Sequence, residues 1–224
     1  MRSSSIRCFF FVFLCWVFLV EKALYGWIIQ PYFMRRFTVR HLALFAVLAA
    51  MCTGIQLTPR PPNVEFTTLI SFLASAVIGM PFGVGLGAFV MFINGFISPS
   101  GFAGLILPFQ MVGMALAGVA GGLYRRSRNG SYNAQSCFET AVLGAFLTLV
   151  YDALTNFAYA MPSMLNGQPV LPTYVAVLVS GAVLSLTHIV SNAVIFGAGF
   201  VPVTNAMQKL LGGETVWKKE SLHT

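Results

Sequence analysis

Apolar residues occur in long, almost uncharged runs, separated by short segments that are rich in proline, glycine and charged residues. A helix that spans a membrane needs about 20 apolar residues, with a range of roughly 17 to 25. Six runs come close to this length, at residues 41–57, 65–80, 82–97, 107–124, 137–159 and 174–201. Proline cannot continue a helix, and Pro59, Pro81 and Pro99 mark the ends of the first three runs. The pattern therefore predicts an all-α integral membrane bundle of six transmembrane helices.

Composition supports this prediction. Hydrophobic residues make up 57% of the chain, charged residues make up 8%, and the mean hydropathy is +0.80. A soluble domain carries about a quarter charged residues, so the lipid bilayer is the first expected partner. The net charge of +7 would suggest nucleic acid for a soluble protein. Here the basic residues lie in short clusters between apolar runs, as loop charges do, and we expect no nucleic-acid partner.

The positions of the basic residues predict the orientation in the membrane, because short cytoplasmic loops accumulate Lys and Arg. All but one of the basic positions after residue 33 fall on the same side of the six predicted helices. These are Arg35, Arg36, Arg40, Arg125, Arg126, Arg128, Lys209, Lys218 and Lys219, whereas the opposite side carries Arg60. Both termini are therefore predicted to be cytoplasmic, and residues 206–224 to form a cytoplasmic polar tail.

Residues 1–33 do not fit the six-helix scheme. An apolar run at 8–20 has the length of a signal peptide and follows two arginines, but no small-residue cleavage site comes after it. If this run spanned the membrane alone, the arginines would face outward. We expect Met34 to be the native start, so that the six helices occupy residues 34–205. An extra helix or an interfacial anchor is the alternative.

The sequence contains no catalytic or metal-binding motif. A phosphate-binding loop that ends in Lys-Ser or Lys-Thr, an HExxH pair and a GxSxG elbow are all missing. The four cysteines have no CxxC spacing, which argues against a disulfide framework and a zinc site. We therefore expect no metal and no cofactor, and the chain is not expected to be an enzyme.

Small residues recur at four-residue spacing, which allows membrane helices to approach closely. Residues 79–87 and 113–121 show this pattern, and packing within the bundle is its simplest explanation. On the first predicted helix, Ala46, Ala50 and Gly54 form a similar stripe. Bundle packing or the helix of a partner protein would account for it equally well.

Polar side chains gather at the predicted outer ends of five helices. Polar residues inside a bilayer are costly and mark cavities or substrate pathways. Asp152 is the hardest to explain by packing, because an unpaired carboxylate there must be protonated, hydrated or bound. The candidate substrate-binding residues at this level are Asn63, Glu65, Asn94, Gln110, Asp152 and Asn156.

His188 and Asn192 share one face of the sixth predicted helix. They are expected to lie deeper than the other polar residues, about 22 Å from the outer end at 1.5 Å per residue. A hydrogen bond across helices is therefore the preferred role for His188. Glu139 is expected to complement a helix N-terminus or the neighbouring arginines.

Several segments in this order resemble one family of membrane proteins, the substrate-binding S components of energy-coupling factor transporters. The resemblance covers about residues 38–205. It depends on the local composition and the order of these segments rather than on an invariant signature. It is carried by the small-residue stripe of the first helix, by Pro62-Asn63-Val64-Glu65, by residues 79–88 (GMPFGVGLGA), by Pro108-Phe109-Gln110-Met111 and by the Gly- and Ala-rich stretch 113–122.

The resemblance implies a six-helix fold with an outward-facing site for a vitamin or similar micronutrient, in the plasma membrane of a prokaryote. It also implies a membrane coupling protein and two ATPase subunits as partners. In related systems the small-residue face of the first helix contacts the coupling protein. Carried over to this chain, that face is Ala46, Ala50 and Gly54. The extension before Met34 departs from the family pattern.

Two other functions stay open. Asp152 and His188 would be the acid and base of an intramembrane enzyme, but they are predicted to lie at different depths, and no second acidic residue is expected to join them. A small-solute channel is the third possibility.

Overall fold

The computed structural model describes residues 39–59, 61–99, 101–130 and 132–210. The predictions for residues 1–33 and for most of the polar tail lie outside this part of the chain. The chain divides into two compact units, Met1–Ala43 and Leu44–Thr224. In the first unit the described residues are 39–43, where the first described helix begins. The core and the candidate site lie within the second unit.

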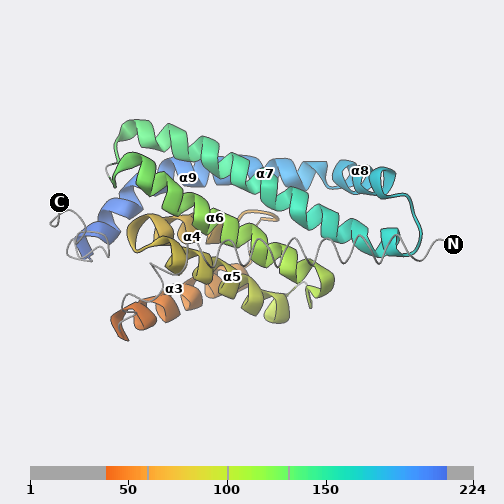
Figure 1. Cartoon of the computed structure of the whole chain (residues 1–224), viewed down its shortest axis with the longest axis horizontal. Helices are drawn as coiled ribbons and strands as arrows, with labels where there is room; N and C mark the ends of the chain where they lie inside the picture. The colour runs from red at the N-terminus through yellow and green to blue at the C-terminus, as the bar shows by residue number, and fades with distance from the viewer. Residues whose placement is uncertain (1–38, 60, 100, 131, 211–224) are drawn as a thin grey trace. The chain divides into compact units, whose positions relative to one another are not determined.

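The described residues form an all-α structure without strands (Figure 1). Its elements are α3 (Val39–Leu57), α4 (Thr67–Val77), α5 (Met80–Ile97), the short 3-10 turn η2 (Gly104–Ile106), α6 (Leu107–Arg128), α7 (Ala134–Leu165), α8 (Val170–Ser180) and α9 (Ala182–Leu210). The predicted helical class is therefore confirmed for this part of the chain.

Five of these helices are long and apolar enough to cross a membrane: α3, α5, α6 together with η2, α7 and α9. This supports a multi-pass membrane protein. The expected second span, at residues 65–80, forms the shorter α4 of 11 residues. At 1.5 Å per residue α4 is about 16 Å long, roughly half of the 30 Å hydrocarbon core. Five described helices, rather than six, thus have spanning length.

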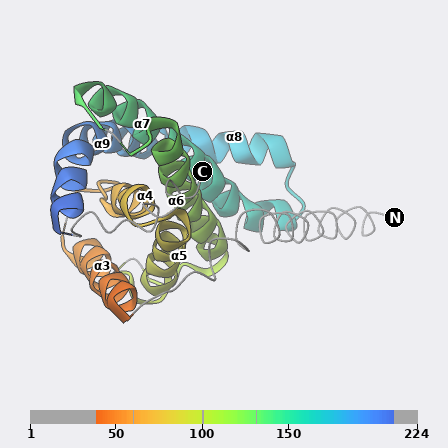
Figure 2. The same cartoon turned by 60° about the vertical axis from the view of Figure 1, so that its left-hand side comes forward.

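Helix α4 is nearly all buried, with ten of its 11 residues hidden from solvent. It packs against α5, α6 and α9, and Figure 2 shows it in the middle of these helices. Glycines make the close approach possible. A Cβ atom at Gly121 would lie 2.1 Å from the carbonyl oxygen of Phe72, and one at Gly83 would lie 2.3 Å from that of Ser71. The predicted packing role of these small residues is confirmed.

Arg125 and Glu139 lie where α6 ends and α7 begins. Arg125 Nη1 donates to the carbonyl oxygens of Ala76 and Val77, at 3.1 and 2.6 Å, and so binds the C-terminus of α4. Glu139 accepts from Arg128 Nε and from the Tyr124 hydroxyl, both at 2.9 Å. The expectation that Glu139 complements neighbouring arginines is confirmed.

Helices α7 and α9 lie side by side (Figure 1), and both differ in extent from the sequence prediction. Helix α7 has 32 residues and continues beyond the predicted end at residue 159, through Pro162 to Leu165. The expected sixth run is divided at Gly181 into α8 and α9. Because α7 extends beyond 159, Asp152 lies near the middle of its helix, 13 residues before Leu165 rather than seven before the predicted end.

Candidate functional site

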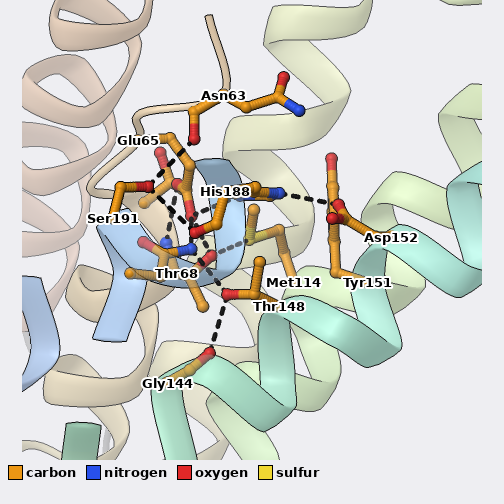
Figure 3. A network of polar contacts seen from close by, with 12 residues as sticks. Asn63, Glu65, Thr68, Met114, Gly144, Thr148, Tyr151, Asp152, His188 and Ser191 are labelled. Carbon is orange, nitrogen blue, oxygen red and sulfur yellow. Dashed lines mark hydrogen bonds and ion pairs between the residues drawn. The ribbon is translucent and has the colours of Figure 1, made fainter. Parts of the chain in front are cut away.

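His188 lies between two buried carboxylates (Figure 3). Its Nδ1 atom is 2.7 Å from Asp152 Oδ1, and its Nε2 atom is 3.7 Å from Glu65 Oε1. The three residues come from three segments: the connection before α4, the middle of α7 and the first half of α9. Asp152 and Glu65 are each 7% exposed and His188 is 5% exposed. The imidazole therefore connects two acidic groups inside an apolar bundle.

The carboxylate of Glu65 accepts three hydrogen bonds besides this contact. The backbone N–H and the hydroxyl of Thr68 both donate to it, the first at 3.1 Å. The first N–H groups of a helix have no intrahelical partner, so Glu65 satisfies one of these groups at the start of α4. Asn192 Nδ2 donates to Glu65 Oε1 at 3.1 Å. The start of α4 and the side of α9 thus both position this carboxylate.

The network continues from Asn192 into α7. Asn192 Nδ2 also donates to Thr148 Oγ1 at 2.8 Å, and the Thr148 hydroxyl donates to the carbonyl oxygen of Gly144 at 2.8 Å. Asn192 is fully buried and Thr148 is 1% exposed. Polar side chains spaced four residues apart on α7 and on α9 therefore face each other in the interior.

Asn63 holds the segment that carries Glu65 against α9. Its Nδ2 atom donates to the carbonyl oxygen of Leu184 at 2.9 Å, and its own carbonyl oxygen accepts from the Ser191 hydroxyl at 3.3 Å. The backbone of Asn63 has a φ of 59°, in the left-handed region that Asn tolerates better than most residues. Asn63 therefore fixes the turn that places Glu65 beside His188.

Tyr151 and two methionines form an apolar side of the site. The ring of Tyr151 meets the His188 ring edge to face, with centroids 5.8 Å apart. The Tyr151 hydroxyl points to Met91 Sδ at 3.9 Å, and the Thr68 hydroxyl is 3.4 Å from Met114 Sδ. Gln110 lies close enough to Tyr151 to interact with its hydroxyl. An aromatic ring thus lies beside the charged groups, and two methionine sulfur atoms contact the hydroxyls next to them.

Four buried polar atoms of this region have no hydrogen-bond partner among the described residues. They are Asp152 Oδ2, Asn192 Oδ1, Gln110 Oε1 and His188 Nε2. Buried polar atoms in proteins are nearly always paired, and leaving one unpaired costs about 1 to 3 kcal/mol. Together they provide unused hydrogen-bonding capacity on α6, α7 and α9, as expected where a small molecule or water binds.

The structure brings some of the six predicted site residues together and leaves others apart. Glu65 and Asp152 meet through His188, Asn63 lies at the edge, and Gln110 lies beside Tyr151. The Asn156 Oδ1 atom lies near Gly181, 3.7 Å from where a Cβ atom would be. Asn94, on α5, shares no hydrogen bond with this group among the described residues. Ligand binding by all six residues stays a prediction.

The interpretation that His188 and Asp152 lie at different depths is wrong, because their side chains are in hydrogen-bond contact. The error came from ending the fifth helix at residue 159, which placed Asp152 too near the outer end. The statement that no second acidic residue joins them is also wrong, since Glu65 reaches His188 from the other side. The preferred role of His188, a hydrogen bond across helices, is confirmed.

Sequence reasoning missed the contributions of Thr68, Thr148 and Tyr151, and gave Asn192 no binding role. One signal was available: Thr148 and Asp152, like His188 and Asn192, are polar pairs four residues apart on otherwise apolar helices. Residues at this spacing share a helix face. Two such faces in one bundle are expected to meet, because neither is stable against lipid.

The small-residue stripe of α3 is exposed. Ala46, Ala50 and Gly54 are all accessible, and a Cβ atom at Gly54 would meet nothing within 4 Å. Ala49 and Cys52, on the other face of α3, are buried in the core. The stripe is therefore not used for packing among the described residues of the bundle.

Comparison with protein-family models, with curated proteins and with solved structures finds no match to this chain.

Proposed function

We propose that this chain is the substrate-specific membrane subunit of an ATP-driven importer of the energy-coupling factor type. It would bind a vitamin or similar micronutrient from the extracellular side. The observation that carries the proposal is the buried cluster of Glu65, His188 and Asp152, with unpaired polar atoms around it, inside an apolar bundle. Ionisable groups at such a place are expensive and are typical of substrate sites.

The proposed topology has six membrane segments, with α4 as the second and both termini in the cytoplasm. The arginines at the end of α6 support this orientation, because clustered basic residues favour the cytoplasmic side. Helix α4 tolerates its short length because it contacts protein rather than lipid over almost its whole surface. The membrane would be the plasma membrane of a prokaryote.

The proposed partners are a membrane coupling protein and two ATPase subunits. The exposed stripe of Ala46, Ala50 and Gly54 supports a contact through α3, since small residues permit close approach of a second helix. No phosphate-binding loop occurs in this chain, so the energy for transport would come from the ATPase subunits.

The test is reconstitution of the full chain in liposomes with and without a coupling protein and its ATPases. The molecule that the purified chain retains, identified by native mass spectrometry, serves as the substrate. Uptake is expected to require ATP and all partners, and the recovered substrate should be chemically unchanged. ATP-independent uptake would contradict the proposal and would favour a channel.

The α3 contact is tested by adding bulk to its exposed face. Ala50→Trp is expected to leave substrate binding intact and to abolish uptake. Ala198→Trp is the matched control, because Ala198 is an exposed alanine on α9. Equal losses in both variants, or unchanged uptake in Ala50→Trp, would remove the α3 interface.

An intramembrane enzyme is the second candidate, and the 2.7 Å contact between His188 and Asp152 favours it. Such a pair is able to act as a general base. However, the hydroxyls of Thr148 and Thr68 donate to other acceptors, and among the described residues no hydroxyl is hydrogen-bonded to the His188 ring. Recovery of a chemically altered substrate, lost in His188→Gln, would establish the enzyme instead.

A further inference from the structure

The charges of the candidate site do not balance. Glu65 and Asp152 contribute two carboxylates. Among the described residues, each of them forms its ion pair with His188. With both carboxylates ionised and the imidazole protonated, the cluster carries one net negative charge. A buried charge without a counter-charge is costly. A positively charged ligand would remove this imbalance when it binds.

The unpaired atoms indicate the same kind of ligand. Three of the four unpaired atoms, Asp152 Oδ2, Asn192 Oδ1 and Gln110 Oε1, are acceptors. The fourth, His188 Nε2, faces Glu65 Oε1 at 3.7 Å. Asp152 is 7% exposed and Asn192 is fully buried, so water from the surface does not easily satisfy them. An acceptor is satisfied by an N–H or O–H donor. A ligand with several N–H groups would therefore supply what α6, α7 and α9 lack.

We propose that the substrate of this site is an organic cation that carries N–H donors, such as a protonated amidine or an amino-substituted nitrogen heterocycle. The proposal extends the importer function above and depends on the same site. The charged end would bind Asp152 Oδ2 and face the pair of carboxylates. The flat part would lie against Tyr151, whose aromatic ring, with methionine sulfur nearby, suits a cationic, polarisable ring.

Two other ligand classes fit the site less well. An anion would meet two carboxylates, with His188 already held by both. A metal ion would need at least three suitable side chains around one point, and no such group of His, Cys, Asp and Glu is found among the described residues. His188 lies between the acidic groups and separates them.

The experiment uses three probes of the same size and shape but different charge: benzamidinium, benzamide and benzoate. The thermal stability of the purified full-length chain in detergent is measured against the concentration of each probe. Benzamidinium is expected to raise the unfolding temperature most, benzamide less, and benzoate not at all. Equal effects of benzamide and benzamidinium, or stabilisation by benzoate, would overturn the proposal, as would the lack of any effect of benzamidinium.

Three variants test where benzamidinium binds. Asp152→Asn keeps the shape and is expected to weaken benzamidinium binding about ten- to a hundredfold, the range for a lost charge-assisted hydrogen bond. Gln110→Met removes a neutral acceptor and keeps the charges, so it should weaken binding several-fold even if Asp152→Asn folds poorly. Glu139→Gln is the control, because it removes a carboxylate that lies outside the cluster. Unchanged binding in Asp152→Asn and Gln110→Met would overturn the site.

These outcomes separate this proposal from the importer function. If benzamidinium binds as expected but no uptake depends on ATP, the importer is wrong and the cation site stands. If ATP-driven uptake of an anionic molecule is found, the importer stands and the cation site is wrong. Stabilisation by Ni²⁺ or Zn²⁺ that is lost in His188→Gln would replace the organic cation by a metal ion.

Discussion

Replacing His188 by Gln would leave Glu65 and Asp152 buried without the group that lies between them. The imidazole is 2.7 Å from one carboxylate and 3.7 Å from the other. Two unit charges about 4 Å apart interact by about 4 kcal/mol at an effective dielectric constant of about 20. Removing one partner of a buried ion pair costs about 3–5 kcal/mol, because the other charge stays buried. We expect His188→Gln to lower the free energy of unfolding by about 3–5 kcal/mol.

The same reasoning predicts that neutral carboxylate replacements rescue the variant. Adding Glu65→Gln and Asp152→Asn to His188→Gln removes the uncompensated charges. Replacing a whole buried ionic group is often close to neutral, so the triple variant should regain most of the lost stability. In the wild-type background, the two carboxylate replacements should instead be destabilising. The sign of their effect would therefore depend on residue 188.

The assay is reversible unfolding in mixed detergent micelles, followed by far-UV circular dichroism. Ser191→Ala serves as the control on the same helix, because its hydroxyl donates to carbonyl oxygens and carries no charge. It should cost about 1 kcal/mol, with the same cost in both backgrounds. If the three charge-removing replacements are simply additive, the three side chains do not act as one electrostatic unit, and the reasoning fails.

Three further predictions concern the packing and orientation of the bundle. Gly121→Ala should destabilise the fold by about 1–3 kcal/mol or more, because the new methyl group overlaps the α4 backbone. Gly54→Ala should instead be neutral or stabilising by up to about 1 kcal/mol. Unfolding in micelles compares the two variants, and equal effects would contradict the close approach of α6 to α4. Arg125→Met should lower the free energy of unfolding by about 1–3 kcal/mol, since two carbonyl oxygens at the end of α4 lose a donor. An unchanged unfolding midpoint would argue against Arg125 as the donor that stabilises this helix end. In a cysteine-free background, Ser127→Cys should react with an impermeant thiol reagent only after the cells are permeabilised. Gln168→Cys should react in intact cells too, and the reverse pattern would invert the proposed topology.

The helical class and most helix positions were predictable because a membrane imposes a simple requirement on sequence. Long apolar runs must form helices, since the backbone has no other hydrogen-bond partners in lipid. It was also predictable that Glu65 and Asp152 would lie in one polar cluster, because a carboxylate in an apolar segment needs polar partners. These two predictions depend on composition over short stretches, which a single sequence provides.

Helix ends were less predictable, and the error in depth follows from them. The fifth helix was expected to end at residue 159, yet α7 continues through Pro162 to Leu165. Proline is tolerated in membrane helices because neighbouring groups satisfy the freed backbone. Thr148 gave no signal by itself, because threonines in helices commonly donate to a carbonyl one turn earlier; its four-residue spacing from Asp152 was the one available indication. Its second contact, with Asn192, depends on how α7 and α9 are placed against each other.

Helix α4 explains why the role of Glu65 could not be assigned from sequence alone. Its N-terminal N–H at Thr68 donates to Glu65, and its C-terminal carbonyls accept from Arg125. An anion at the N-terminus and a cation at the C-terminus both stabilise the helix dipole, and this effect is stronger in a buried helix. Glu65 therefore has a structural function as well as its place in the site. A loss of ligand binding in Glu65→Gln would combine both effects. Asp152 has no such contact with a helix end, so the unpaired Oδ2 atom of Asp152 gives the cleaner measure of what the site binds.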